Sequence, residues 1–318
     1  SNNLVKNSIR SSLVFEIALT VLSCLKAGTR ADVAWIADYE GPEIAGKNGA
    51  IAITPGGGKM GSVLSNAIDG QLIDHARRQV TDGQLISFSI SGVDALINGV
   101  PEGGKATCVC VPASELPSKI WPALIERNPI CITCEIGANS ITNFNFYTSQ
   151  TISNAPQIAT ELFAKGTTGS LIDGKLIVSV WFPITRLVIA GLGPIAEALD
   201  AVAQLIGWNV SMAGNPDIST GMIMGLSPVD ATVIMHHNVE DAGRALSSAL
   251  DSRVGYIGAV GSKTMQVTRA NWLAYRGYSD ISRIYGPAGL PIGAKSPSEI
   301  AISILAEAMA ATNLRKSA

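Results

Sequence analysis

The sequence predicts an α/β protein of two domains: an N-terminal α/β domain over residues 1–184 and a C-terminal Rossmann-like, doubly wound parallel sheet over residues 185–318. Three observations support this prediction. The length of 318 residues leaves room for two domains that each bury an apolar core. Strand-like and helix-like segments alternate from residue 187 onward, as in a parallel sheet with helices on both faces. The turn GLGPIA at 191–196 joins the first of these strands to a helix.

In the N-terminal half, strand-like and helix-like segments also alternate, and these segments are shorter. The apolar and polar periodicities predict several strands and helices. The Asp173-Gly174 pair lies between two apolar runs, which predicts a two-residue hairpin turn because such turns need positive φ angles. We expect strands at 32–37, 49–54, 83–90, 106–113 and 129–136, and helices at 12–26, 66–80, 115–128 and 154–165.

The C-terminal half begins after a short polar joint at 183–186, which sets the domain boundary. Ser296, Pro297 and Glu299 form a capping box with proline at the first helical position, and they fix the start of the last helix. In such a sheet the ligand crevice lies at the C-terminal ends of the strands. We expect strands at 187–191, 208–213, 231–237 and 254–260, and helices ending near 206, 250, 276 and 311.

Composition excludes several classes of partner. Charged residues make up only 15% and hydrophobic residues 47%, so surplus apolar surface predicts a subunit interface, and we expect a homodimer. The net charge is −2 and no Lys/Arg run occurs, which argues against nucleic acid and against an anionic membrane surface. The apolar stretch 13–25 is interrupted by Glu16 and reads as a packed helix rather than a signal or membrane segment. We therefore expect a cytoplasmic protein.

The five cysteines form an odd set without an export signal, so we expect no disulfide framework. Cys131 and Cys134 have the spacing of a metal or redox pair. However, they lie in the strand-like run PICITCEI, where residues three apart point to opposite faces, so we interpret them as buried structural cysteines. Three histidines are too few for an all-protein zinc site, and we expect no metal site.

Two glycine turns are candidates for phosphate binding. In the first, Gly191 and Gly193 allow a tight turn and close backbone approach to a phosphate, and Pro194 begins the helix. In the second, at 258–264, exposed amides, hydroxyls and a lysine suit an oxyanion. Its candidate contacts are Gly258, Gly261, Ser262 and Lys263. The more N-terminal PGGGKMGS stretch does not fit the Walker A spacing, and both readings, a plain turn and a phosphate loop, stay open.

Ordinary NAD recognition lacks its acidic residue. The second Rossmann strand should end in a carboxylate that binds the ribose hydroxyls, but here it is followed by Gly214 and Asn215, and the first carboxylate is Asp217. NAD(P) binding is therefore a doubtful alternative.

We expect a different environment for each of the three histidines. His237 ends a strand on the crevice side, where an imidazole can contact a ligand and transfer protons. His236 is equally well explained by hydrogen bonds to backbone carbonyls, and His75 is expected at the surface. Lys295 lies beside the last capping box and is a further candidate contact. The sequence identifies no catalytic residue.

Residues 255–307 carry a family resemblance. GYIGAVGSK and YGPAGLPIGAKSPSEIAISILAE resemble the C-terminal signature of the XdhC/CoxI family of xanthine dehydrogenase accessory proteins, and LVIAGLGPIAEAL and ATVIMHHN are similar to their counterparts there. The resemblance covers residues 187–311 closely and the first 80 more loosely. It implies binding of molybdenum cofactor (molybdopterin) as cargo, sulfuration of that cofactor by a cysteine desulfurase, and its delivery to a molybdenum hydroxylase of xanthine dehydrogenase type. The contacts that it implies are Gly191, Gly193, His237, Gly258, Gly261, Ser262 and Lys263.

The sequence departs from the family at three places, which indicates a divergent member. Ala67 stands where the family carries a cysteine after its glycines, so no thiol chemistry occurs at this position. EGPEIAGKNG, at 40–49, replaces an arginine-containing segment, and the residues at 214–216 replace an acidic and arginine pair.

Three functional hypotheses follow. The first is a cofactor-handling accessory protein, a chaperone that need not catalyse a reaction itself. The second is an NAD(P)-dependent oxidoreductase that uses the same glycine turn. The third is a scaffold that keeps its partner enzyme but has lost affinity for the ligand.

Overall fold

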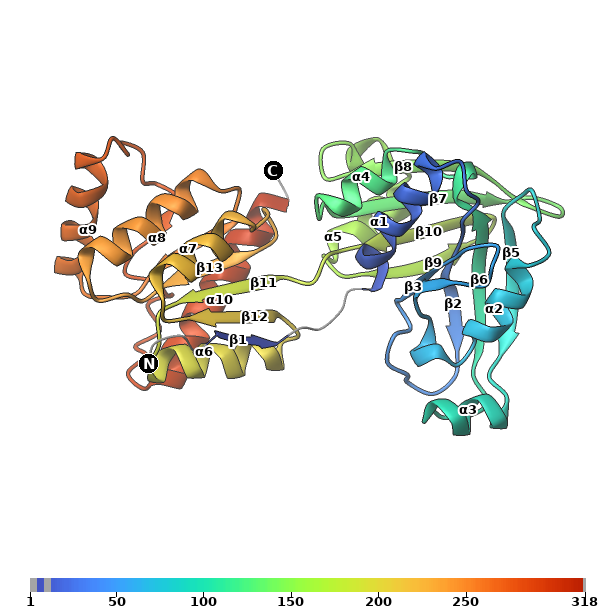
Figure 1. Cartoon of the computed structure of the whole chain (residues 1–318), viewed down its shortest axis with the longest axis horizontal. Helices are drawn as coiled ribbons and strands as arrows, with labels where there is room; N and C mark the ends of the chain where they lie inside the picture. The colour runs from blue at the N-terminus through green and yellow to red at the C-terminus, as the bar shows by residue number, and fades with distance from the viewer. Residues whose placement is uncertain (1–4, 9–12, 317–318) are drawn as a thin grey trace. The chain divides into compact units, whose positions relative to one another are not determined.

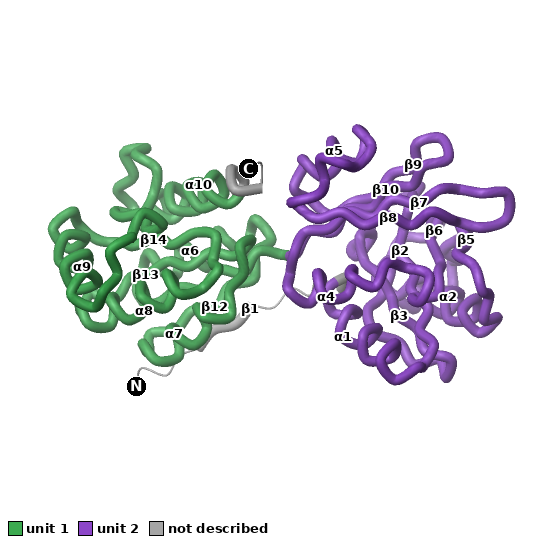
Figure 2. Tube along the Cα trace, turned by 90° about the horizontal axis from the view of Figure 1, so that it is seen from above, with its two compact units in different colours: residues 1–10, 184–318 green, residues 11–183 purple. Residues whose placement is uncertain are grey.

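The structure is a computed structural model that describes residues 5–8 and 13–316, and it divides into two compact units (Figures 1 and 2). One unit comprises residues 11–183, here called the N-terminal unit, and the other comprises residues 1–10 and 184–318, here called the Rossmann unit. From the sequence, residues 1–10 are expected in the N-terminal domain. Instead, β1 (Val5–Ser8) pairs antiparallel with β12 (Asn209–Ala213) of the Rossmann unit. No alternation of apolar and polar residues marks so short a strand.

The Rossmann unit is built on a six-stranded sheet in the order β1-β12-β11-β13-β14-β15, in which every pair except β1–β12 is parallel. The chain leaves β11 to one side for β12 and then crosses to the other side for β13, so the strand order reverses between β11 and β13. This arrangement confirms the predicted doubly wound sheet. Its further elements are β11 (Arg186–Ala190), β13 (Ala231–Ile234), β14 (Tyr256–Ala259), β15 (Ile284–Tyr285), α6 (Pro194–Leu205), α7 (Pro216–Met224), α8 (Val239–Asp251), α9 (Lys263–Tyr275) and α10 (Pro297–Lys316).

Alternate residues of the parallel strands pack on opposite faces of this sheet. Leu187 and Ile189 of β11 lie in a core with α6 and α10, whereas Val188 and Ala190 lie in a second core with α7, α8 and α9. A run that is apolar at every position is what a strand covered on both faces requires. It follows that α6 and α9, the helices that the two glycine turns begin, cover opposite faces of the sheet.

The N-terminal unit contains two antiparallel sheets with short helices. One sheet has the order β4-β3-β2-β6-β5 and the other the order β8-β7-β10-β9. The strands are β2 (Asp32–Glu40), β3 (Ala50–Ile53), β4 (Lys59–Gly61), β5 (Gln84–Ser89), β6 (Lys105–Pro112), β7 (Ile130–Ile136), β8 (Ile141–Thr148), β9 (Gly169–Asp173) and β10 (Leu176–Trp181). The helices are α1 (Leu13–Lys26), α2 (Asp69–Ala76), α3 (Gly92–Asn98), α4 (Ile120–Ile125) and α5 (Gln157–Ala164), with 3-10 turns at Leu64–Asn66, Ala113–Glu115 and Ile152–Asn154.

Several boundaries differ from the prediction. The helices expected at 66–80 and 115–128 are shorter, and α3, α7, β4 and β8 are additional elements. The predicted hairpin forms between β9 and β10, where Asp173 pairs with Leu176 and Gly174 takes a φ of 58°. The central turn residues are therefore Gly174 and Lys175, one position later than expected.

The two sheets of the N-terminal unit share a core in which Trp35 and Trp181 meet edge to face, with ring centroids 5.3 Å apart. The indole N–H of Trp35 donates to Ser179 Oγ at 2.8 Å, which satisfies the buried polar group. Cys134 packs in this core and Cys131 in a separate core, which confirms that they point to opposite faces of β7. Burial raises the pKa of both thiols to about 12, so neither is a nucleophile near neutral pH.

The expectation of a surface position for His75 is wrong, because only 6% of it is exposed. Leu72, His75 and Ala76 have the i, i+3, i+4 spacing of one helix face, and this face of α2 covers the sheet. His75 lines a small cavity together with Asp32 and Cys110. Its Nε2 has no hydrogen-bond partner among the residues described.

Burial, with a smaller contribution from Arg78, lowers the pKa of His75. A lowered pKa means that the unfolded chain binds the proton more tightly than the folded one, so stability falls as the pH drops below the ordinary value of about 6.5. We expect the N-terminal unit to unfold at lower temperature at pH 5 than at pH 7.5, and His75→Leu to reduce this difference, as measured by calorimetry on the full chain. An unchanged pH dependence in His75→Leu would contradict a neutral buried imidazole.

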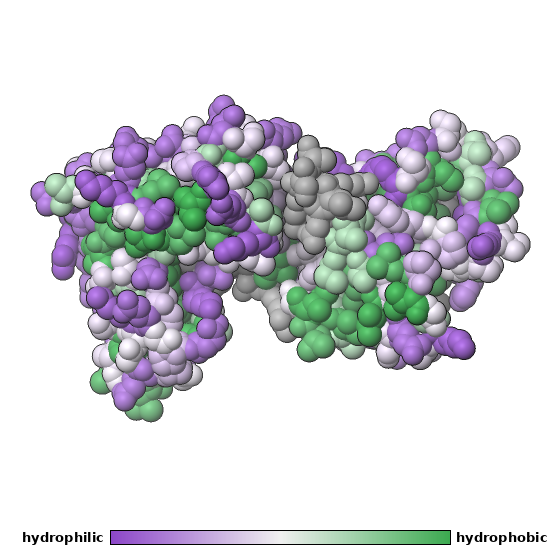
Figure 3. Space-filling model, turned by 180° about the vertical axis from the view of Figure 1, so that it is seen from behind, coloured by the Kyte–Doolittle hydropathy of each residue, from purple (hydrophilic) through white to green (hydrophobic). Residues whose placement is uncertain are grey.

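Large apolar side chains are exposed in both units. Val93, Leu96 and Ile97 are exposed on α3, and hydrophobic residues lie among hydrophilic ones at the end of the lower left lobe in Figure 3. In the Rossmann unit, Leu205 and Ile206 are exposed at the end of α6, and Ile302 and Met309 on α10. A homodimer remains a prediction for which these surfaces are candidates. In the described part of the chain no helix combines the length and the apolar character needed to cross a membrane.

Candidate functional site

The C-terminal ends of β11, β13 and β14 bring three predicted segments to one edge of the Rossmann sheet (Figure 1). The turn 191–193 follows β11, His236 and His237 follow β13, and the turn 260–262 follows β14. Since β13 lies between the other two strands, the two glycine turns begin roughly 10 Å apart. We call this edge the crevice of the Rossmann unit.

The two glycines of the first turn have different roles. Gly191 has a φ of 136°, and a Cβ at this position would lie 2.9 Å from Met235 Cβ, so only glycine lets the turn pack against the end of β13. Gly193 has a φ of 124°, and no heavy atom lies within 4 Å of the position that a Cβ would take. The backbone is therefore open to close approach at Gly193.

Helix α6 begins without a side-chain cap. Gly193 is its N-cap residue and offers no side-chain bond, while Pro194 has no N–H to donate. The backbone N–H groups of Ile195 and Ala196 are thus the first donors of the helix, at the positive end of its dipole. Side chains cap the three other helices that follow directly on β12, β13 and β14, through Asn215, Asn238 and Ser262. The start of α6 is therefore the end best suited to bind an anion from outside.

The second turn is arranged differently. Gly258 lies within β14, is buried, and would place a Cβ 2.8 Å from the Tyr256 ring, so its role is packing rather than ligand contact. Ser262 accepts a hydrogen bond from Met265 N at 3.3 Å as the cap of α9. Lys263 is the first residue of that helix and is exposed. Because α6 and α9 cover opposite faces of the sheet, a ligand that contacts both turns has to lie across the sheet edge, over the end of β13.

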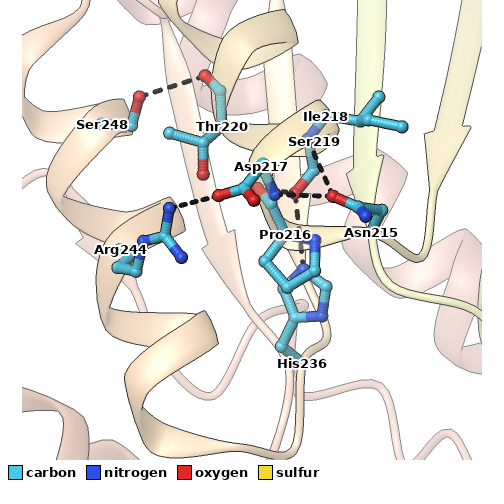
Figure 4. Close-up of polar contacts among 9 residues, drawn as sticks. All are labelled: Asn215, Pro216, Asp217, Ile218, Ser219, Thr220, His236, Arg244 and Ser248. Carbon is cyan, nitrogen blue, oxygen red and sulfur yellow. Dashed lines mark hydrogen bonds and ion pairs between the residues drawn. The ribbon is translucent and has the colours of Figure 1, made fainter.

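The two histidines after β13 differ in exposure. His236 is 9% exposed, and its Nε2 lies 3.4 Å from Ser219 Oγ, a contact drawn in Figure 4. Burial lowers the pKa of His236, with an opposing contribution from Asp241, so the ring is neutral at physiological pH. His237 is exposed at the crevice, on the segment between the two turns.

Arg269 of α9 is a crevice residue that the sequence analysis does not identify. It is 2% exposed and donates to the carbonyl oxygens of Val260 at 2.7 Å and His236 at 2.9 Å. Arg269 thereby joins the ends of β13 and β14. Its spacing of four residues from the buried Leu273 is the one sequence signal that places it on the inner face of the helix.

The end of β12 carries no acidic residue for a ribose. Asn215 Oδ1 accepts from the amides of Asp217 and Ile218, so it is engaged as a helix cap (Figure 4). Asp217 forms an ion pair with Arg244. Leu192 lies over Gly214, where a Cβ would come within 2.6 Å of its side chain.

Lys295 lies at the start of α10, on the same face of the sheet as α6. Its backbone N–H and that of Ser296 donate to Glu299, at 2.8 and 2.9 Å, which confirms the predicted capping box and its structural role. Thr312 contacts Gly255 at the beginning of β14, so α10 runs back along the sheet and its first turn lies toward the crevice.

The segment that departs from the family motif in the N-terminal unit has an unusual backbone. Leu64, Ser65 and Asn66 take φ angles of 49°, 52° and 72°, values that glycine adopts much more readily. Ala67 follows and is buried in the core. Asp69 completes the turn, since it accepts from Lys59 at 2.5 Å and from Val63 N at 2.9 Å.

These features define a class: a Rossmann-fold protein whose crevice presents an uncapped helix N-terminus and lacks the carboxylate of ordinary dinucleotide-binding domains. Residues 187–308 match the sequence profile of the XdhC Rossmann domain. This match confirms the resemblance for the Rossmann unit, residue range 187–308.

Two further proteins are similar to this chain. The uncharacterized protein YqeB of Escherichia coli K12 is 28% identical over 161 residues, which are 44% of this chain and 29% of that protein, so the match spans less than a third of this relative. A crystal structure of a xanthine dehydrogenase from Bacillus halodurans aligns over 95% of this chain and 97% of that one, with a TM-score of 0.44 and 15% identity.

Proposed function

We propose that this protein is an accessory protein that binds the phosphate-bearing molybdenum cofactor at the crevice of the Rossmann unit. In this proposal it holds the cofactor while a cysteine desulfurase acts on it, and it assists insertion into a molybdenum hydroxylase of xanthine dehydrogenase type. The observation that carries the proposal is the uncapped start of α6 beside the open backbone of Gly193. The XdhC Rossmann domain supports the accessory role.

The residues of the crevice fit the phosphate end of this cofactor. The amides of Ile195 and Ala196 supply hydrogen-bond donors, and Lys263 supplies an exposed positive charge on the other side of β13. When bound, the cofactor itself supplies the metal chemistry. Four of the five cysteines are buried, and burial raises the pKa of each of these thiols. We therefore assign binding and presentation to the crevice, and no ligand exchange to these four thiols.

The end of β12 argues against the oxidoreductase alternative. Asn215 is engaged as a helix cap, and Leu192 lies over Gly214 where ribose hydroxyls would approach. A dinucleotide would therefore lose the hydrogen bonds that normally fix its ribose.

Parallel titrations test the proposal. The purified full chain is incubated with molybdopterin released from a molybdoenzyme and separately with NADH and NADPH, and bound pterin and nicotinamide are measured by fluorescence. We expect saturable pterin binding and no tight nicotinamide binding. Tight nicotinamide binding without pterin binding would overturn the proposal. Binding of neither ligand, together with co-purification of a hydroxylase, would support a scaffold instead.

Lys263→Ala is expected to weaken binding of the phosphate-bearing ligand at low salt, by roughly three- to tenfold, because an exposed lysine acts through its charge. The loss should shrink as salt is raised, since ions screen an exposed charge. Lys175→Ala, which removes another exposed lysine from the β9–β10 hairpin, is the control and should leave the affinity unchanged. Equal affinities of Lys263→Ala and the wild type would remove the second turn from the site.

A further inference from the structure

Arg269 is a buried cation without a carboxylate partner in the described part of the chain. Its guanidinium contacts three oxygens, those of Val260, His236 and the Gln266 side chain, and all three are neutral. Burial lowers the pKa of Arg269, and no acidic residue offsets this effect. Neutral oxygens satisfy hydrogen bonds, but they leave the positive charge itself uncompensated.

The guanidinium lies directly behind the second turn. A Cβ at Gly261 would lie 3.4 Å from Arg269 Nη1 and 3.0 Å from Met265 Sδ, so glycine is what lets the backbone pass this close to the charge. Gln266 holds the same turn, since its side-chain amide donates to the carbonyls of Ala259 and Gly261 at 3.0 and 3.2 Å. The turn is therefore held from behind, and the positive charge of Arg269 lies buried beneath its backbone.

The same arginine is coupled to the first turn through His236. Arg269 Nη2 binds the carbonyl oxygen of His236, and the backbone N of His236 lies 3.5 Å from the position that a Cβ of Gly191 would take. A change at Arg269 thus acts on the ends of three adjacent strands, β11, β13 and β14.

We infer that Arg269 is a buried positioning residue that makes the crevice selective for a doubly negative phosphate group. This inference rests on the proposed function and names the ligand charge that the same site takes. A dianion at the crevice compensates a charge that the folded protein otherwise leaves unpaired, whereas a neutral ligand does not.

Burial separates the effect of Arg269 from that of Lys263. Salt screens an exposed charge strongly and a buried charge weakly. The contribution of Arg269 to anion binding should therefore persist at high salt, where the contribution of Lys263 is reduced.

The test is a titration with inorganic phosphate, followed by ³¹P NMR, at pH 8 and at about 0.05 and 0.5 M salt. It compares the full-length wild type, Arg269→Gln and Arg269→Lys. We expect Arg269→Gln, which keeps hydrogen-bond donors but loses the charge, to weaken phosphate binding roughly tenfold at both salt concentrations. Arg269→Lys, which keeps the charge but loses the planar fork, should stay within about threefold of the wild type.

Equal losses in both variants would mean that Arg269 only supports the backbone, and no loss in either would mean that its charge does not reach the ligand. Both results overturn the inference while leaving the proposed function intact. Absence of phosphate binding to the wild type would instead contradict the proposed function.

A measurement on the wild type covers the case in which Arg269→Gln does not fold. In about 0.5 M salt, the second pKa of bound phosphate should lie below that of free phosphate, because a buried cation stabilises the dianion even when exposed charges are screened. Other titratable groups around the crevice include His236, His237, Asp241 and Lys263, and His237→Gln is included to remove the exposed imidazole. Bound phosphate that titrates like free phosphate would overturn the inference.

Discussion

Pro194→Glu is expected to reduce binding of the phosphate-bearing ligand by roughly 10- to 100-fold without unfolding the Rossmann unit. Pro194 is exposed at the first position of α6, next to the open backbone of Gly193. A carboxylate there repels a phosphate at the same helix end. The same carboxylate interacts favourably with the dipole of α6. We therefore expect Pro194→Glu to be at least as stable as Pro194→Gln, which carries no charge at this position.

Pro194→Gln is the matched control because it has the size of glutamate without its charge. We expect it to retain most of the wild-type affinity. Binding is measured with inorganic phosphate and with molybdopterin, and stability by thermal unfolding. If the Glu and Gln variants bind equally well, the ligand does not lie at the start of α6.

The largest loss of stability is expected for Asp230→Ala. Asp230 is fully buried and accepts hydrogen bonds from the backbone N–H groups of Ser227 and Arg186 and from the Ser227 hydroxyl, at 2.8 to 2.9 Å. Removing this buried carboxylate takes the acceptor away from these donors, at a cost of about 3–5 kcal/mol in the free energy of unfolding.

Asp217→Ala gives the comparison, because Asp217 is a mostly exposed partner of Arg244 and such surface pairs contribute about 0–1 kcal/mol. Stability is measured by urea unfolding of the full chain, followed by circular dichroism. We expect the transition of the Rossmann unit to shift for Asp230→Ala and not for Asp217→Ala. Similar shifts for the two variants would show that burial does not control the strength of these contacts.

The fold of the Rossmann unit follows from its sequence because each strand is flanked by strong local signals. The GLGPIA turn, the capping box at Ser296 and the continuous apolar runs act over a few residues, and all three are found in the structure. The burial of Cys131 and Cys134 on opposite faces of β7 could also be predicted, because side chains alternate between the two faces along a strand.

Features that depend on distant contacts could not be predicted in this way. β1 pairs with β12 across about two hundred residues, and no local pattern encodes that choice of edge. The burial of His75 and Arg269 follows from which face of a helix meets the sheet, and a polar side chain on that face resembles a surface residue in the sequence. The placement of α6 and α9 on opposite faces follows from the strand order, which the sequence does not specify.

The central claim is that the backbone at the start of α6 binds an anionic headgroup. Its most direct test is a backbone amide NMR titration of the full chain with inorganic phosphate. We predict that the largest chemical-shift changes occur at Ile195 and Ala196, with smaller changes at Lys263 and Thr264. Changes confined to other helix ends, or no saturable change at Ile195 and Ala196, would contradict the claim.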